Sequence, residues 1–400
     1  MTDSIIHQCL DKKGLDQTQI TTLKEGWQGA SWPSSKEEVW RYSKLNWLND
    51  SWTLIADSPV SSSYENYLSD FEIETYDNDL VSMQGKFLSS QMKGVKCLSG
   101  KTLEPKNISW SDDFFNQLGW LGLNDWAKIE LTENQSLEGQ WHCILDHEKS
   151  WQNLKLFIHV KKNAHLRLKV NVIAPKAVTN LSLKVIVEKG GSCQLMSWTA
   201  PESKVIIDHE VNLDERSEYR YDAMNFEANW CHERINIDVG KHANAYLSGL
   251  LLPTKNQNDH KAIKVNHQAP NGQSMQKFYS VADANGLAAF HGRAIVNQTA
   301  PKTNARQLAR ALMLSKSCEV YSRPELEIDI DDVQCQHGSS IGELDLKALF
   351  YLRSRGISLD EAKSMLIAGF IEEVVSGLEK KEQSWVRKRI SLHGIGRENL

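Results

Sequence analysis

Residues 160–187 read VKKNAHLRLKVNVIAPKAVTNLSLKVIV, and this stretch decides the fold. Apolar and polar side chains alternate through residues 166–172, and the same alternation returns in residues 181–187. A period of two is the pattern of a β-strand, whose successive side chains point to opposite faces. The stretch therefore predicts two strands, each with one apolar face.

A recurring phrase extends this pattern along the chain. In each copy a valine precedes a short polar or glycine-bearing turn, after which a new alternating run begins, and the valines are Val160, Val187, Val211 and Val239. The steps between them are 27 (160 to 187), 24 (187 to 211) and 28 (211 to 239). Such a loose period predicts the stacked coils of a β-solenoid. An antiparallel sandwich of hairpins stays open, since short strands at regular spacing suit it as well.

Helical patterns return after residue 341. Asp345 is placed to cap a helix that ends at Gly356, and Ser358 with Glu361 forms a capping box at the start of a second helix. The apolar stripe of the second helix is more typical of a core-facing surface than of a binding surface. Two helices can bury only one side on a solenoid end, however, so part of the stripe is left for another protein.

Composition limits the class of protein. A chain of 400 residues with 40% hydrophobic and 24% charged residues is typical of a soluble globular protein with two or three domains. A formal net charge of -5 disfavours nucleic acid as a partner. We expect a cytoplasmic protein without a membrane partner, because no apolar run reaches the ~20 residues of a membrane span and the N-terminus lacks a signal-peptide core. Seven scattered cysteines without Cys-x-x-Cys fit a reducing compartment.

Cys335 and His337 are the residues most suited to ligand chemistry. They stand two apart in an extended segment, so they would share one face. Thiolate and imidazole are ligands of soft metals and iron-sulfur clusters, but such sites need three or four ligands. Either a partner chain supplies the rest, or Cys335 is a small core residue, which is what the spacing alone favours.

The remaining motifs are incomplete. Residues 100–102 (Gly-Lys-Thr) lack the glycine that a phosphate-binding loop needs at 95, so no nucleotide site is predicted. The run Asp329, Asp331 and Asp332 lacks the glycine and the glutamate of a calcium loop. There is no nucleophile elbow and no His-Glu-x-x-His. No catalytic residue is predicted.

The stretch from Arg323 to Gly356 resembles the SufD subunits of the SUF iron-sulfur cluster assembly machinery. Weaker similarity covers Gly286 and residues 290–292 (Phe-His-Gly), and residues 40–43 (Trp-Arg-Tyr-Ser) are similar to the N-terminal motif of that family. Departures at Gln334, Gln336, Ser339 and Ser340 leave the thiolate and the imidazole in place. The matching residues are Pro324, Leu326, Glu327, Ile328, Asp331, Asp332, Val333, Cys335, His337, Gly338, Gly342 and residues 350–356.

This resemblance implies a right-handed parallel β-helix flanked by helical domains, in agreement with the predicted solenoid. We expect a mainly helical domain at 1–130, the β-helix core at 131–340 and a helical domain for ATPase docking at 341–400. The resemblance also implies a non-catalytic scaffold subunit that pairs with its paralogue SufB and docks the ABC-type ATPase SufC.

A transient iron-sulfur cluster would form at the interface between SufB and this chain, with Cys335 and His337 as candidate ligands. A flavin in the complex is part of the same expectation, although no residue of this chain can be assigned to it. The residues expected to meet the ATPase are Leu346, Phe350, Tyr351, Arg353, Arg355, Met365 and Phe370.

Two alternatives remain open at this point. The chain could be the SufB paralogue, although the equivalent SufB segment lacks the Cys-x-His-Gly run. It could also be a solenoid carbohydrate-active enzyme that uses Asp329, Asp331 and Asp332. Enzymes of that kind are typically secreted, so the missing signal peptide disfavours this second alternative.

Overall fold

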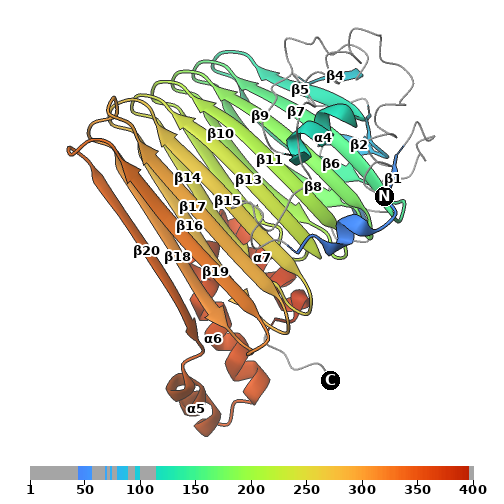
Figure 1. Ribbon diagram of the computed structural model, residues 1–400, viewed down its shortest axis with the longest axis vertical. Coiled ribbons are helices and arrows are strands. Elements are labelled where there is room, and N and C mark those ends of the chain that lie inside the picture. Colours follow the sequence, from blue (N-terminus) through green and yellow to red (C-terminus); the bar gives the residue numbers. More distant parts are fainter. Residues whose placement is uncertain are drawn as a thin grey trace.

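The computed structural model describes residues 44–55, 68–69, 73, 79–88, 95–99 and 114–395. These residues form a parallel β-solenoid of eight coils, with α4 (Phe114–Leu121) packed on one sheet and the C-terminal helices on the other (Figure 1). Each coil gives one strand to each of two sheets that face each other across the interior. The sandwich of antiparallel hairpins is thereby excluded, because the strands of successive coils pair in parallel.

The two sheets, named sheet A and sheet B, take alternate strands of the chain. Sheet A contains β1 (Thr53–Leu54), β4 (Val95–Ser99), β5 (Asp125–Leu131), β7 (Ser150–Val160), β9 (Val178–Val187), β11 (Lys204–Leu213), β13 (Trp230–Val239), β15 (Asn258–His267), β17 (Leu287–Val296) and β19 (Glu319–Ile328). Sheet B contains β2 (Asp79–Met83), β3 (Lys86–Phe87), β6 (Ser136–Ile144), β8 (His165–Ile173), β10 (Ser192–Thr199), β12 (Glu218–Met224), β14 (Asn244–Leu251), β16 (Gln273–Ala282), β18 (Asn304–Met313) and β20 (Gln334–Glu343).

The valine phrase marks the corner at which the chain leaves sheet A. Val160, Val187 and Val239 are the last residues of β7, β9 and β13. The third copy is corrected by the register, in which Leu213 and not Val211 pairs with both Val187 and Val239. The steps are therefore 27 (160 to 187), 26 (187 to 213) and 26 (213 to 239). The sequence pattern placed this corner at Val211 because Val211, like Leu213 two residues later, is an apolar residue that points into the interior.

Left-handed backbone explains the polar residues of these corners. Asn163, Gly190, Arg216 and His242 have φ values of 56°, 70°, 57° and 56° at equivalent turns. Glycine and asparagine adopt this conformation most readily. Backbone hydrogen bonds join neighbouring turns, for example from Asn163 N–H to the carbonyl of Lys189. The turns therefore stack with the same geometry as the strands.

The interior of the coils is apolar through most of the solenoid. Leu166, Leu168 and Val170 of β8 are buried in one continuous cluster with the inward residues of the neighbouring coils. Full burial of one such side chain contributes about 1.5–3 kcal/mol. Because the register has no shift between coils, one apolar row stacks on the next, and this stacking stabilises the solenoid.

The N-terminal part combines helix and strand within the described residues. It contains a 3-10 helix, η2 (Asn46–Asn49), and α4 (Phe114–Leu121), which packs on sheet A. β2 and β3 pair antiparallel as a hairpin. The aromatic motif at 40–43 lies outside the described residues. The division into domains at 130 and 340 stays a prediction.

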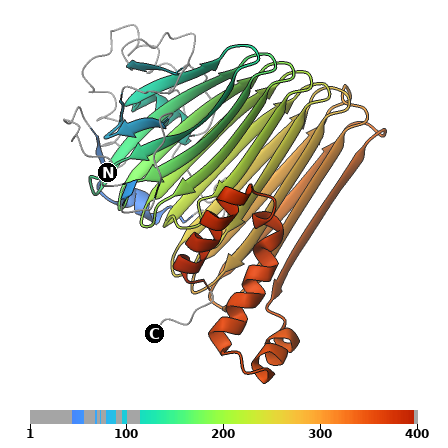
Figure 2. The same cartoon turned by 180° about the vertical axis from the view of Figure 1, so that it is seen from behind.

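Three helices follow the last coil: α5 (Leu346–Ser354), α6 (Leu359–Val375) and α7 (Lys380–His393). Figure 2 shows α6 and α7 lying across the outer face of the solenoid and α5 standing beyond it. The caps agree with the prediction, because Asp345 accepts hydrogen bonds from two backbone N–H groups of α5, and Ser358 accepts one from Glu361 N–H. None of the described helices is long and apolar enough to cross a membrane.

Candidate functional site

The sequence-predicted pair lies on β20, the last strand of the solenoid. Cys335 pairs with Ala305 and His337 with Gln307 on β18. Ala305 and Gln307 are buried and face the interior, so Cys335 and His337 share the inner side of sheet B. Gln336, between them, faces outward. The pair therefore stands at the C-terminal opening of the solenoid interior.

No further coil covers this opening among the described residues. The residues of β17 alternate between buried and partly exposed, whereas none of the residues of β19 and β20 is buried. A hydrogen bond of 2.8 Å between the hydroxyls of Ser322 and Ser339 joins β19 to β20 across the end of the interior. Both terminal strands also keep one free backbone edge in the described part of the chain, which is a template for pairing with another strand.

The surroundings of Cys335 favour the neutral thiol. Partial burial raises its pKa above the ordinary value, and a backbone hydrogen bond from Ala305 opposes this shift in part. A thiol must lose its proton to bind a metal ion. In the described residues, no group of three or more His, Cys, Asp or Glu side chains is arranged to hold a metal. Within the part of the chain that the structure describes, Cys335 and His337 thus offer at most half of a ligand set.

The acidic residues considered for carbohydrate chemistry occupy the turn between β19 and β20. Asp329, Asp331 and Asp332 are all exposed, and the backbone carbonyl of Asp332 accepts a hydrogen bond from Lys302 N–H. None of the cavities described below is lined by these carboxylates. Nothing in their arrangement supports a glycosidase-type pair.

A second exposed surface lies on α5, which has no buried residue. Its large apolar side chains Leu346, Phe350 and Tyr351 are 73%, 75% and 57% exposed. Arg355 lies over the ring of Tyr351 at 5.2 Å, and Arg353 is also exposed. Exposed apolar side chains gathered on one short helix are typical of a protein-binding surface.

By contrast, α6 and α7 are packed against the outer face of sheet B. Ile367, Ile371 and Val386 are buried in one cluster with Phe226 and Leu250 of the solenoid. Of the docking residues predicted on α6, Met365 is 49% exposed, whereas Phe370 is only partly exposed and packs on Tyr279 with ring centres 5.1 Å apart. The structure therefore brings together the docking residues on α5 and separates Phe370 from them.

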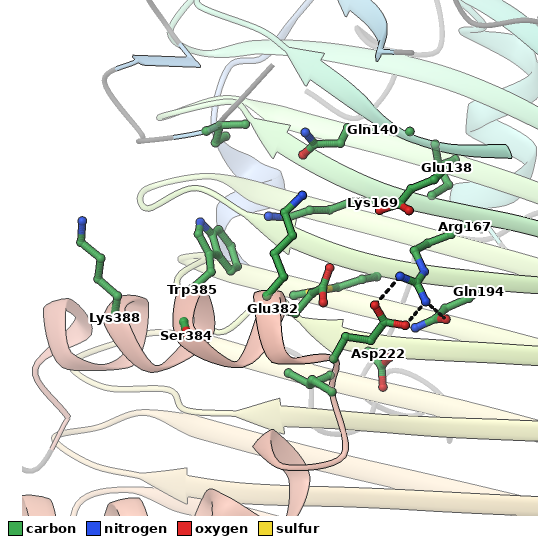
Figure 3. A pocket seen from close by; sticks show the side chains of 17 residues that line it. Glu138, Gln140, Arg167, Lys169, Gln194, Asp222, Glu382, Ser384, Trp385 and Lys388 are labelled. Carbon is green, nitrogen blue, oxygen red and sulfur yellow. Dashed lines mark hydrogen bonds and ion pairs between the residues drawn. The ribbon is translucent and has the colours of Figure 1, made fainter. Parts of the chain in front are cut away.

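Polar contacts also fix α7 to the solenoid. Figure 3 shows the groove between them, a cavity of about 600 Å³ in which Arg167 contacts Gln194. Arg167 also forms an ion pair with Glu379, and Lys169 lies 3.6 Å from the ring centre of Trp385. Arg167 and Lys169 thus help to hold α7 on the solenoid. In the same groove, one carboxylate oxygen of Glu382 is buried without a hydrogen-bond partner among the described residues.

The sequence analysis missed α7 and its central contact. Arg389 is almost completely buried, and it donates hydrogen bonds of 2.7 and 3.0 Å to the carboxylate of Glu227. The apolar spacing of Trp385, Val386 and Ile390 could have indicated this helix. The partner of Arg389 could not have been found, because Glu227 lies 162 positions away in the chain.

The fold defines a parallel β-solenoid protein in which β19 and β20 are the last described strands of their sheets. A family model for the SufBD core domain of the SUF system for iron-sulfur cluster assembly matches residues 143–370. The chain belongs to this SufB/SufD family, since the match covers more than half of its length.

Curated relatives agree with this assignment. The chain is 34% identical over 163 residues to an iron-sulfur cluster assembly SufBD family protein of Synechocystis (40% of this chain, 36% of that protein). It is 34% identical over 139 residues to the iron-sulfur cluster assembly protein SufD of Escherichia coli (35% and 33%). Identity to SufD of Bacillus subtilis is 38% over 106 residues (25% and 24%). The matched part spans only about a quarter to a third of the lengths of these relatives.

Proposed function

We propose that this chain is a SufD-type, non-catalytic scaffold subunit for iron-sulfur cluster assembly. In this proposal the open terminal coil pairs with a SufB-type paralogue, and the C-terminal helices dock the ATPase SufC. The observation that carries the proposal is the uncovered end of the solenoid, where Cys335 and His337 lie on the inner side of an edge strand. The cluster is the cargo of the complex and not a resident cofactor of this chain.

Pairing through the terminal coil follows from the two edge strands. A partner with the same architecture can add one strand to β19 and one to β20, so that both sheets continue into the second subunit. The edges supply backbone hydrogen bonds, and the exposed Ile328 and Ile341, at 43% and 48%, supply apolar contact. Covering this end places Cys335 and His337 inside the interface.

Cluster assembly at that interface requires both residues in their deprotonated forms. The pKa of Cys335 is raised in the free chain, so its thiol becomes a ligand when iron displaces the proton, and a positive group of the partner would favour this by stabilising the thiolate. His337 supplies an imidazole nitrogen, and the paralogue supplies the remaining ligands. No residue of this chain is assigned to a flavin in the complex.

Cluster yield in a reconstituted complex of the three subunits tests the ligand proposal. We expect Cys335→Ser and His337→Ala to lower the visible absorption of the assembled cluster, measured anaerobically, while the complex stays intact by mass. Gln336→Ala is the matched control, because Gln336 lies between them on the opposite face. An unchanged yield in His337→Ala would remove that residue from the ligand set.

Docking of the ATPase is assigned to α5, because α6 and α7 are already occupied by the solenoid. Deletion of the C-terminal segment is an unsuitable test, since it would expose Phe226 and Leu250 to water. Phe350→Asp changes only an exposed side chain and should weaken ATPase capture about 30-fold or more, as for a typical interface hot spot. Leu392→Asp on α7 is the control, because Leu392 is similarly exposed at 63%. Equal capture by both variants would place docking elsewhere.

A further inference from the structure

A cavity of about 560 Å³ lies at the corner where the chain passes from sheet B to sheet A. Three parts of the chain that are distant in sequence meet there: η2, three successive coil turns, and the end of α7 at His393. We name it the lysine-tryptophan cavity. Its lining residues are Lys44, Asn46, Trp47, Lys204, Asn229, Trp230, Thr254, Lys255, Asn256, Gln257, Asn258 and His393.

The floor of the cavity is set by the solenoid register. Lys204, Trp230 and Asn258 are the first residues of β11, β13 and β15, and they pair side by side. Residues 254–257 form a turn that makes one wall of the cavity. The side-chain oxygen of Gln257 stabilises this turn by accepting a hydrogen bond of 3.0 Å from Thr254 N–H. Lys255 occupies the left-handed position of this turn, with φ of 49°. The lysines are therefore presented by rigid elements.

The described lining carries three lysines and no carboxylate. Lys44 is engaged by an ion pair of 3.2 Å with Glu319, which lies outside the lining. Burial lowers the pKa of Lys204, and the nearby Asp50 opposes this shift. The Lys204 ammonium also lies 5.1 Å from the ring centre of Trp52, and no ion pair of Lys204 is formed among the described residues. An anion in the cavity would compensate for the burial of this charge.

Two indole N–H groups at the cavity are also unsatisfied. The Nε1 atoms of Trp47 and Trp230 are buried and find no hydrogen-bond acceptor in the described part of the chain. The two rings pack at 62° with centres 4.9 Å apart, and the Trp47 side chain is partly exposed. Buried donors without acceptors cost free energy, so a ligand oxygen that reached either of these N–H groups would stabilise the site.

We propose that the lysine-tryptophan cavity binds a phosphate-bearing organic molecule of nucleotide size. Lys204 and Lys255 hold the phosphate, and the planar part of the molecule lies against Trp47. Inorganic phosphate would fill only a small part of this volume, which falls in the range of small-molecule sites. The proposal is independent of the scaffold function, since the cavity shares no residue with the terminal coil or with α5.

Calorimetric titration of the full chain at low salt tests this proposal, with AMP, adenosine and pyrophosphate as probes. We expect AMP to bind and adenosine not to bind. Lys204→Gln and Lys255→Ala should each raise the Kd for AMP about tenfold, the effect of one charge-assisted hydrogen bond, without lowering the Tm. Lys241→Ala is the control, because Lys241 is an exposed lysine in a turn at the opposite corner of the coils.

Several outcomes would overturn the proposal. Absence of AMP binding at millimolar concentration would exclude the site. If adenosine bound as tightly as AMP, the phosphate group would not contribute to binding. If pyrophosphate bound as tightly as AMP, the organic part of the ligand would not contribute. A loss in Lys241→Ala equal to that in Lys255→Ala would show binding by general surface charge.

Discussion

Replacement of Arg389 by methionine should detach α7 from the solenoid without unfolding the coils. Arg389 and Glu227 form a two-pronged ion pair at 2.7 and 3.0 Å, with side-chain exposures of 8% and 5%. Removing one member of a buried pair leaves an uncompensated charge, which costs about 3–5 kcal/mol. Arg389 also stacks on Trp198 at 4.6 Å, a contact that methionine keeps in part. We therefore expect a loss near the lower value.

Hydrogen exchange resolved by segment measures this loss directly. A change of about 3 kcal/mol should lower the protection of α7 amides about 100-fold, while amides of β9 and β11 keep their protection. The midpoint of urea unfolding of the whole chain then measures the stability of the solenoid separately from that of the helices.

The double variant Glu227→Gln with Arg389→Met serves as the control. The introduced amide oxygen can still accept the hydrogen bond that Trp198 donates to Glu227 at 2.6 Å, and no unpaired charge is left. The double variant should recover most of the protection lost in the single variant. The reasoning fails if Arg389→Met costs less than about 1 kcal/mol in α7, or if the double variant is as unstable as the single one.

Three further predictions concern the solenoid itself. Burial lowers the pKa of His209 to about 4 from 6.5, so stability present above pH 6.5 should be lost as the pH falls toward 4, and His209→Gln should flatten this slope in urea titrations at several pH values. Gly286→Ala should lower the Tm through a destabilisation of about 1–3 kcal/mol, because its Cβ would overlap the Pro253 carbonyl, whereas Gly342→Ala, with open space around it, should leave the Tm unchanged. Gln307→Leu should raise the midpoint of urea unfolding of the free chain by removing a buried amide without a partner among the described residues, and an unchanged or lower midpoint would contradict this.

The strand pattern could be predicted from the sequence because the solenoid repeats one physical rule in every coil. Alternation gives the strands, and polar turns at left-handed positions give the corners. The misplaced Val211 shows the limit of that argument, since alternation leaves the corner uncertain by one period of two whenever the preceding inward residue is also apolar. Only the register, which pairs Leu213 with Val187, resolves it.

The candidate site could be predicted only in part. The shared face of Cys335 and His337 follows from their spacing, but their place at the open end depends on how many coils follow β20. The docking residues illustrate the same difficulty, because the sequence predicted Phe370 and Phe350 alike to contact the ATPase. Tyr279, far away in sequence, covers Phe370 and leaves Phe350 exposed.

The interior changes from apolar to polar along one register row of sheet B, and this change bears on the proposed interface at the last coil. The row runs from Leu168 and Leu195 through Tyr221 and Leu247 to Gln276, Gln307 and His337. The amide oxygens of Gln276 and Gln307 are buried without a hydrogen-bond donor among the described residues. Buried polar groups without partners cost free energy, so the coils nearest the open end are less stabilised by their interior than the apolar coils before them. The last coils therefore have a more polar and less stable interior at the position of the proposed cluster site. This is more consistent with a subunit interface there than with a solvent-exposed end of the solenoid.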